Sequence, residues 1–353
     1  MSSEHAPDEI PPNRAPYIYR WDMDKTYLAT EFDTVKDLIR TAFQGPADKA
    51  NVPGSAVLLR ELRASSGGGA MIYFISGSPR QMRGVLSEKL RLDGIHFDGF
   101  ILKDNLSNLL KGRFKALKEQ VGYKLPALLQ ARAQAPLGSR ETLFGDDAER
   151  DAFIYSLYAD LLARRVDHDT LEAVFDVAGL YPDSRAAIVQ GLQALETVDP
   201  VDRVLIHLER RSPPIRFDAY GPRVAPVYNY FQAALVLFQD GRLPASSVGR
   251  LATTLIEQYQ FTERMLLRSF QDTLRRNILD YNAAQRLGAQ ALQTGVSQTV
   301  IDLFAREATE VNVQPQPSRP QTVPDYPALL ARELKRHKIE KARRKKVSRR
   351  WWS

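Results

Sequence analysis

Residues 17–28 read YIYRWDMDKTYL. A β-prone run, Tyr17 to Tyr19, leads into two aspartates one residue apart, Asp22 and Asp24. Carboxylates at this spacing repel each other unless something cationic lies between them. Mg²⁺ is the natural candidate, because it prefers hard oxygen ligands. The stretch therefore predicts a strand that ends in a metal-assisted reaction centre.

The surrounding sequence alternates between strand and helix patterns from about residue 15 to 165, which predicts a parallel sheet with helices on both faces. Functional groups in such sheets gather beyond the carboxyl ends of the strands. Asp22, Ser76 and Asp146 each follow an expected strand, so we expect them to lie together. The expected elements are helices over 32–43, 52–64, 81–90 and 123–133, and strands over 71–75, 97–102 and 141–144.

The later part of the chain has apolar residues at helical spacing, which predicts an all-α domain over residues 166–310. A loop with four prolines, residues 210–226, interrupts it. We expect residues 1–14 to be disordered, residues 311–327 to form a Pro-rich linker, and residues 328–353 to form a basic tail. The expected helices cover 170–180, 184–195, 227–238, 246–275 and 278–292.

Composition narrows the class of protein. The 353 residues are 44 % hydrophobic and contain no cysteine, which excludes disulfides, thiolate metal sites and cysteine nucleophiles. There is no signal pattern and no apolar run of the ~20 residues that a membrane span needs, so we expect a soluble, cytoplasmic protein. Residues 332–353 carry eleven Lys and Arg against two Glu, so their charge of +9 leaves −2 for the rest of the net +7.

The motifs resemble those of the haloacid-dehalogenase (HAD) superfamily of phosphohydrolases. Its DxDx[T/V] motif is matched by residues 22–26, its strand-ending Ser by Ser76 in FISGSP, and its acidic GDxxxxD by residues 145–151 in FGDDAERD. Within the superfamily the chain looks closest to phosphatidate phosphatases of the actin-patch-associated kind and, more distantly, to the lipins. The resemblance covers about residues 15–165 and includes the Tyr of GDxxxxDxxxY, here Tyr155.

The resemblance implies a role for each motif residue. Asp22 would be the nucleophile that forms an acyl phosphate, and Asp24 would protonate the leaving alkoxide and then activate water. Mg²⁺ would be held by Asp22, the carbonyl of Asp24, and Asp146. Ser76 and Lys124 would hold the phosphoryl oxygens. The supporting residues would be Thr26, which orients the loop, Asp147 and Asp151.

Several lysines compete for the third motif. We choose Lys124 because it opens a helix that leads into the next strand, with Lys115 as second choice over Lys103, Lys111 and Lys118. Two positions depart from the family pattern. Lys25 stands where Asp is usual and could change substrate preference, and Asp147 replaces a small residue and could be a second ligand or a surface group.

Short inserts predict an open site. Neither residues 26–76 nor residues 76–124 have room for a large cap domain, so we expect a capless enzyme acting on a bulky substrate. Phosphatidate or a related phospholipid is favoured by the resemblance. The alternatives are a phosphoprotein or soluble phosphomonoester as substrate, or an inactive module that binds anionic lipid or nucleic acid through its tail.

Three further features have open interpretations. The tail, residues 332–353, ends in Trp351-Trp352 and could be solvated, lie on an anionic membrane as a peripheral contact, or bind nucleic acid, which we favour less. The histidines, His207 among them, are expected to be surface or capping residues. An arginine cluster around the Pro-rich loop is either solvated or an anion-binding rim; its members are Arg203, Arg210, Arg211, Arg216 and Arg223.

Overall fold

The structure is a computed structural model that describes residues 16–29, 51–67, 69–103, 116–291, 322–336 and 339. The helix expected over 32–43 and the two lysines at 111 and 115 lie outside the described residues. The segments that would hold a cap are also only partly described.

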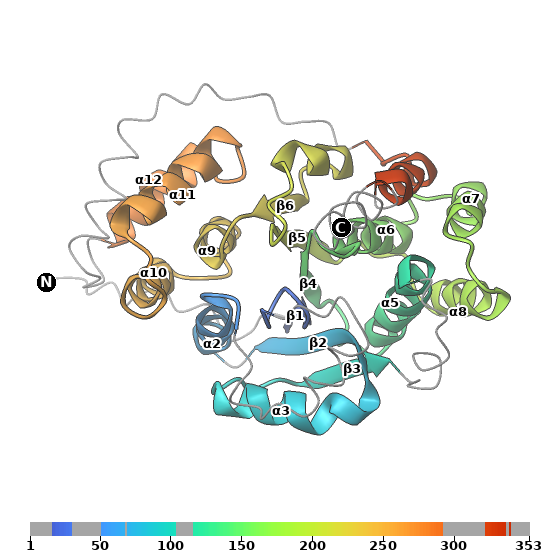
Figure 1. Ribbon diagram of the computed structural model, residues 1–353, viewed down its shortest axis with the longest axis horizontal. Coiled ribbons are helices and arrows are strands. Elements are labelled where there is room, and N and C mark those ends of the chain that lie inside the picture. Colours follow the sequence, from blue (N-terminus) through green and yellow to red (C-terminus); the bar gives the residue numbers. More distant parts are fainter. Residues whose placement is uncertain are drawn as a thin grey trace, which may run out of the picture.

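One parallel sheet of six strands forms the centre of the described molecule, in the order β3-β2-β1-β4-β5-β6 (Figure 1). β1 lies in the middle, where both of its edges are paired, so the carboxyl end of β1 is surrounded by those of its neighbours. The expected α/β fold with a parallel sheet is confirmed. The strands are β1 (Tyr17–Asp22), β2 (Ala70–Pro79), β3 (Gly99–Lys103), β4 (Arg140–Asp146), β5 (Val201–His207) and β6 (Val224–Val227).

β1 presents alternating side chains to two separate cores, since successive residues of a strand point to opposite faces. Tyr19 and Trp21 belong to one core, and Trp21 stacks on Phe144 of β4 with ring centroids 3.9 Å apart. Arg20 and Asp22 point to the other face and are both buried. The strand therefore fixes the direction of Asp22 by the packing of the aromatic residue that precedes it.

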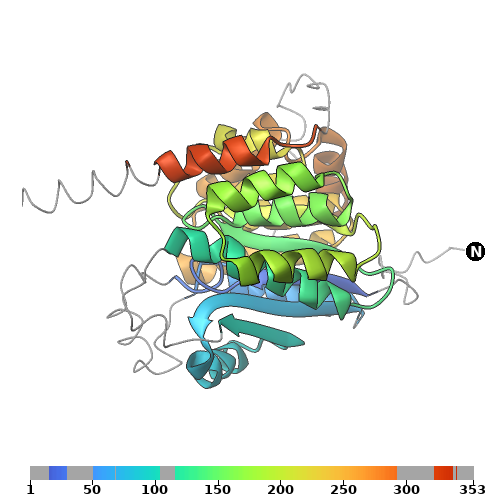
Figure 2. The ribbon, with the colours of Figure 1, turned by 90° about the vertical axis from the view of Figure 1, so that its right-hand side faces the viewer.

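Helices cover both faces of the sheet (Figures 1 and 2). The Trp21 face is covered by α2 (Ser55–Ser65), α3 (Arg83–Leu92), α9 (Tyr230–Gln239), α10 (Ala245–Tyr259), α11 (Glu263–Arg275) and α12 (Tyr281–Ala291). The Asp22 face is covered by α5 (Ala116–Ala133), α6 (Asp151–Leu162), α7 (His168–Ala178) and α8 (Pro182–Gln193). Two short 3-10 helices, η2 (Arg80–Met82) and η3 (Pro214–Tyr220), also lie among the described residues.

The region expected to be all-helical also supplies two strands of the sheet. β5 pairs with β4, and β6 pairs with β5. The four-residue β6 contains Pro226, which an edge strand can accommodate because one side of it makes no ladder hydrogen bonds. The helix expected over 246–275 is two helices, because Gln260 ends α10 in a left-handed conformation and Thr262 caps α11. α9 to α12 form the helical C-terminal region.

Residues 326–336 form a helix where the sequence suggested the end of a linker and the start of a basic tail. Tyr326, Leu329 and Leu330 are buried in the core of the Asp22 face. The Tyr326 hydroxyl donates a hydrogen bond of 2.6 Å to Asp160 Oδ2 on α6. This C-terminal helix, red in Figure 2, therefore belongs to the folded body.

Candidate active site

A tight loop follows β1 at the carboxyl edge of the sheet. Met23 accepts backbone hydrogen bonds from both Tyr27 and Leu28, and Lys25 N donates to the Leu28 carbonyl. Lys25 adopts a left-handed backbone conformation, φ 59°, which lets the chain turn back immediately after Asp24. The loop thus holds Asp22 at the strand end and turns Asp24 into the same region.

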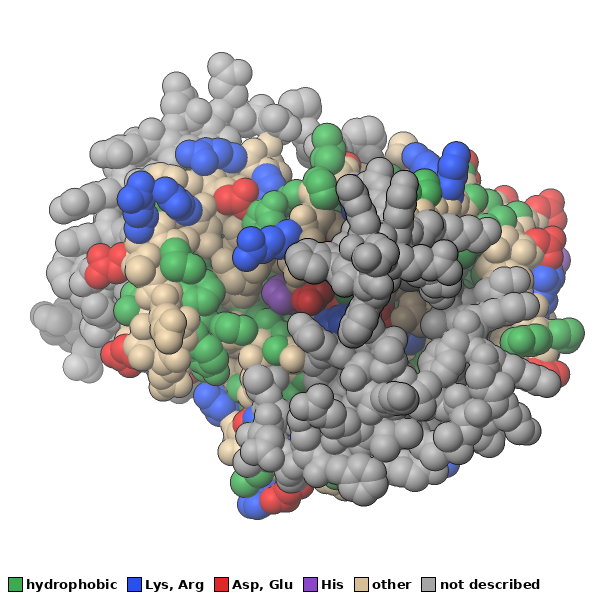
Figure 3. All heavy atoms as spheres, viewed as in Figure 1, with side chains coloured by type: hydrophobic (Ala, Val, Ile, Leu, Met, Phe, Trp, Pro, Cys, Tyr) green, Lys and Arg blue, Asp and Glu red, His purple; other side chains and the backbone are tan. Residues whose placement is uncertain are grey.

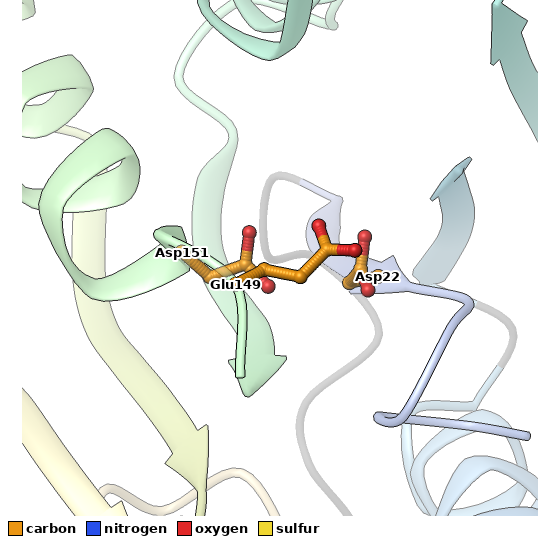
Figure 4. A group of neighbouring side chains, drawn as sticks. All are labelled: Asp22, Glu149 and Asp151. Carbon is orange, nitrogen blue, oxygen red and sulfur yellow. The ribbon is translucent and has the colours of Figure 1, made fainter. Parts of the chain in front are cut away.

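Lys124 joins three carboxylates. Its Nζ donates hydrogen bonds of 2.7 Å to Asp22 Oδ1, 2.8 Å to Glu149 Oε2 and 2.6 Å to Asp151 Oδ1. The three carboxylates come from the end of β1, the turn after β4 and the start of α6 (Figure 4). α5 brings Lys124 there, and Tyr123 on the same helix donates to the Ser76 carbonyl at 3.0 Å.

The turn after β4 is shaped by its own carboxylates. Asp146 Oδ1 accepts hydrogen bonds from the backbone N–H groups of Ala148 and Glu149 at 2.6 and 2.7 Å. Asp151 Oδ2 accepts from Asp146 N at 3.2 Å. A Cβ at Gly145 would lie 2.3 Å from the Asp151 Cβ, so glycine is required for this close approach. The GDxxxxD pattern therefore corresponds to a turn that places Asp146 and Asp151 side by side.

Two buried carboxylate oxygens have no hydrogen-bond partner among the described residues: Oδ2 of Asp22 and Oδ2 of Asp146. The side chain of Asp22 is 1 % exposed and that of Asp146 is fully buried. Such orphan acceptors are costly unless another group satisfies them. Both belong to residues whose other oxygen is already held, by Lys124 or by backbone N–H groups, so each carboxylate keeps one oxygen for a further ligand.

The electrostatics of the cluster favour a cation. Burial raises the pKa of Asp22 well above its ordinary value, although Lys124 opposes this, and the neighbouring carboxylates raise it further. Burial, Asp151 and Glu149 likewise raise the pKa of Asp146. Burial raises the pKa of Asp151 to about 6. Burial would lower the pKa of Lys124, but the carboxylates around it raise it. One ammonium thus stands among four carboxyl groups.

The acidic cluster could hold a metal ion. Asp22, Glu149 and Asp151 each offer an oxygen within 4.8 Å of the others. All three carboxylates also bind Lys124 Nζ, so a metal that used the oxygens bound to Lys124 would have to displace the ammonium. The orphan oxygens of Asp22 and Asp146 fit a resident cation better, because a ligand there would displace nothing.

Asp24 and Ser76 form a second group beside the cluster. Ser76 Oγ donates a hydrogen bond of 2.9 Å to Asp24 Oδ2 and accepts one of 3.0 Å from Ser78 N. Ser76 is buried, whereas Asp24 is only half-buried. Thr26 is buried, and its Oγ1 has no partner among the described residues.

Residues 21–168 match a protein-family model described as the catalytic domain of the phosphatidate phosphatase APP1. This part of the chain is a phosphatidate phosphatase-type domain. The resemblance that the motifs suggested is confirmed, and the matched residues include every predicted site residue. Comparison with curated proteins and comparison with solved structures gave no significant match.

Two residues outside the matched part contact the loop after β1 of the phosphatidate phosphatase-type domain. His207, at the end of β5, places Nδ1 3.2 Å from the Lys25 carbonyl. Tyr230, the first residue of α9, donates its hydroxyl to the Thr26 carbonyl and stacks against both His207 and Trp21. The expectation that His207 is a surface or capping residue is wrong, because its strand was not recognised and the residue is buried.

The remaining residues of the motif-four turn bind neighbouring elements. Asp147 accepts hydrogen bonds from the backbone N–H groups of Arg210 and Ser212 at 2.8 and 2.9 Å, so it fixes the loop after β5. Arg150, only 5 % exposed, reaches Glu333 of the C-terminal helix at 3.4 Å. Sequence reasoning missed Glu149 and Arg150, although both lie inside the GDxxxxD pattern that it used.

The arginines expected to cluster near the Pro-rich loop divide into two groups. Arg203 pairs with Asp240, and Arg223 pairs with Asp199. Arg210, Arg211 and Arg216 instead lie on or just after the loop that Asp147 holds, and no ion pair joins them to a carboxylate of the described chain. In Figure 3, acidic, basic and histidine side chains meet in a hollow near the ends of β4 and β5.

Proposed function

We propose that the protein is a Mg²⁺-dependent, HAD-type phosphomonoester hydrolase that works through an aspartyl phosphate on Asp22, with phosphatidate or a related phospholipid as substrate. One observation carries the proposal: the buried, orphan Oδ2 atoms of Asp22 and Asp146 lie in a cluster with an excess of carboxylates. A pair of carboxylate oxygens at a strand edge suits a hard divalent cation.

Asp22, Asp146 and the carbonyl of Asp24 would hold the metal. When bound, Mg²⁺ would reduce the repulsion between an anionic ester and the Asp22 carboxylate and stabilise charge on the phosphoryl oxygens. Lys124 would hold Asp22 in place, since it binds Asp22 Oδ1 at 2.7 Å, and would supply positive charge for the phosphoryl group. Glu149 and Asp151 would in turn orient Lys124.

In the first step the Asp22 carboxylate attacks phosphorus and the bond to the ester oxygen breaks. The carboxyl group of Asp24 gives its proton to the leaving alkoxide. In the second step the Asp24 carboxylate takes a proton from water, whose oxygen attacks phosphorus, so that inorganic phosphate leaves and Asp22 is regenerated. Asp24 suits this role because it is more exposed than Asp22 and is oriented by Ser76 and Ser78.

A lipid substrate is supported by the family of the matched residues. None of the described helices is long and apolar enough to cross a membrane. In this proposal the enzyme reaches its lipid from the membrane surface, as a peripheral cytoplasmic protein.

The test measures release of phosphate from phosphatidate vesicles and from p-nitrophenyl phosphate, with and without Mg²⁺. We expect Mg²⁺-dependent turnover by the wild type and a loss of about a thousandfold or more in Asp22→Asn. Asp169→Asn is the matched control, because Asp169 is an exposed aspartate on α7. Equal turnover by Asp22→Asn and the control would refute the mechanism.

The same two substrates also test which class of phosphate ester the enzyme prefers. Hydrolysis of the soluble ester without hydrolysis of phosphatidate would move the protein to soluble phosphoesters or phosphoproteins. A phosphate mimic such as BeF₃⁻, soaked with Mg²⁺ into crystals, should bind at Asp22. Density for both ligands elsewhere would contradict the assignment of the site.

A further inference from the structure

A second surface lies beside the candidate active site and is built from two elements that the motif-four turn holds. One is the loop after β5, residues 208–213, which leads into η3. The other is the C-terminal helix, residues 326–336. Asp147 binds the first through Arg210 N and Ser212 N, and Arg150 binds the second through Glu333.

The two elements also touch each other. Tyr220, the last residue of η3, donates its hydroxyl to Glu333, and the charge of Arg336 acts on both Tyr220 and Glu333. The contacts to Asp160 and Arg150 show that the C-terminal helix runs antiparallel to α6, from Tyr326 to Glu333. Since α6 starts at the carboxyl edge of the sheet, the C-terminal helix ends there. Figure 2 shows the red helix ending on the side to which the arrow of β2 points.

This surface combines exposed apolar and exposed cationic side chains. Ile215 is 75 % exposed and Ile339 is 47 % exposed. Arg211, Arg216, Lys335 and Arg336 are also exposed, and none of them forms an ion pair within the described ranges. Figure 3 shows hydrophobic and basic side chains over η3 and the C-terminal helix.

We propose that exposed residues of the loop after β5, of η3 and of the C-terminal helix, with Ile339 just beyond residue 336, form a docking surface for an anionic lipid bilayer, which holds the candidate active site against the membrane. We call it the docking surface; it consists of Arg211, Ile215, Arg216, Lys335, Arg336 and Ile339. The proposal deepens the proposed function and rests on it for the membrane as the source of substrate. Cationic residues are attracted by anionic headgroups, and apolar side chains among them enter the headgroup region.

Charge complementarity favours an anionic bilayer as the partner of the docking surface. Residues 1–331 carry a net charge of −2, yet Arg211, Arg216 and Lys335 are exposed and form no ion pair with another described residue. In the sequence, the basic residues 341–350 follow soon after the C-terminal helix. The docking surface would orient the protein, since it lies next to the turn that carries Asp146 and Asp151.

The experiment measures flotation of the full chain with vesicles of phosphatidylcholine and phosphatidylserine. Phosphatidylserine carries negative charge but is no phosphomonoester, so binding is measured without catalysis. We expect Ile215→Asp with Arg216→Glu to weaken binding by about tenfold or more, because it reverses one cationic contact and removes an apolar one. Lys335→Glu with Arg336→Glu should weaken it similarly.

The matched control is Leu137→Asp with Arg286→Glu, which makes the same change in charge as Ile215→Asp with Arg216→Glu. Leu137 is 93 % exposed before β4, at the opposite edge of the sheet, and Arg286 is exposed on α12. We expect the control to float like the wild type. All variants should hydrolyse p-nitrophenyl phosphate equally, which shows that they are folded.

Two outcomes would overturn the docking surface: equal flotation of the test and control variants, or no flotation of the wild type. A chain ending at residue 340 keeps the C-terminal helix; if it binds no vesicles while Ile215→Asp with Arg216→Glu binds normally, the tail alone is the contact and the proposal is wrong. Vesicle binding by a protein without phosphatase activity would refute the proposed function and leave the docking surface standing.

Discussion

The amino ends and the carboxyl ends of the strands form two opposite edges of the sheet, and charged side chains are arranged differently at each. At the amino edge, Asp202 accepts hydrogen bonds from Tyr17, Arg140 and Arg242. Burial alone would raise the pKa of Asp202, but these partners lower it below its ordinary value. At the carboxyl edge, the pKa values of Asp22, Asp146 and Asp151 are raised. Asp202 is thus paired with cations at the amino edge, whereas the carboxylates of the candidate active site are crowded together, and raised pKa values of this kind are typical of functional sites.

At the carboxyl edge the ammonium of Lys124 binds three carboxylates. We expect Lys124→Met to cause the largest change of all, because it leaves Asp22, Glu149 and Asp151 facing one another. Breaking a buried ion pair costs about 3–5 kcal/mol of unfolding free energy, and losing a charge that holds a phosphoryl group costs about a hundredfold or more in kcat. Chemical denaturation and turnover should be measured on the same sample. An unchanged kcat would mean that Lys124 acts only in the fold.

The second-largest expected effect is stabilisation by Mg²⁺, which should depend on the carboxyl edge and not on the amino edge. Mg²⁺ at a hundred times its Kd should stabilise the wild type by about 2.7 kcal/mol, as any ligand specific to the folded state does. Asp146→Asn should lose this stabilisation, because it removes one of the two orphan carboxylate oxygens. Asp202→Asn should keep it. Thermal unfolding with and without Mg²⁺ measures the difference, and stabilisation that survives in Asp146→Asn would place the metal elsewhere.

The amino edge should affect stability alone. We expect Asp202→Asn to lower the free energy of unfolding by about 1–3 kcal/mol, since it weakens charge-assisted hydrogen bonds to Arg140 and Arg242. Its kcat should stay within about twofold of the wild type. Urea unfolding and turnover on p-nitrophenyl phosphate test this together. A large loss of activity at unchanged stability would contradict the division between the edges.

The smallest effect is in the pH dependence of unfolding. Because the pKa of Asp202 is lowered in the folded state, its contribution to stability is present above its ordinary pKa of 3.8 and is lost as pH falls through the folded value. Asp151 behaves in the opposite sense: its contribution is present below 3.8 and is lost as pH rises through about 6. Denaturation of the metal-free protein at several pH values should show Asp202→Asn to be less sensitive to acid than the wild type.

The carboxyl edge could be predicted from the sequence because its chemistry needs particular residue types in a fixed order. Asp22, Ser76, Lys124 and Asp146 were named from motifs, and the structure brings them to one edge. Their catalytic roles stay predictions. Lys124 could be chosen over other lysines only through the helix that it opens.

The other parts of the carboxyl edge could not be predicted from sequence motifs. β5 is a short buried strand, and a short apolar run does not distinguish a strand from a helix by its period. His207 and Tyr230 matter through contacts with residues 25 and 26, about two hundred positions earlier, and no local pattern records such contacts. The C-terminal helix could not be predicted because its many charged residues are typical of a solvated tail. Pro327 near its start is nevertheless typical of a first helical turn.

The position of β4 in the strand order has a consequence for dissecting the molecule. Similarity to the phosphatase family ends at residue 168, but β4 pairs along its outer side with β5, which begins at Val201. A polypeptide trimmed at the similarity limit would leave without partners those backbone N–H and C=O groups of β4 that bond to β5, while the side of β4 that pairs with β1 would stay paired. Open strand edges recruit other strands. Such a fragment should self-associate, so the limit of family resemblance is a poor place to cut this chain.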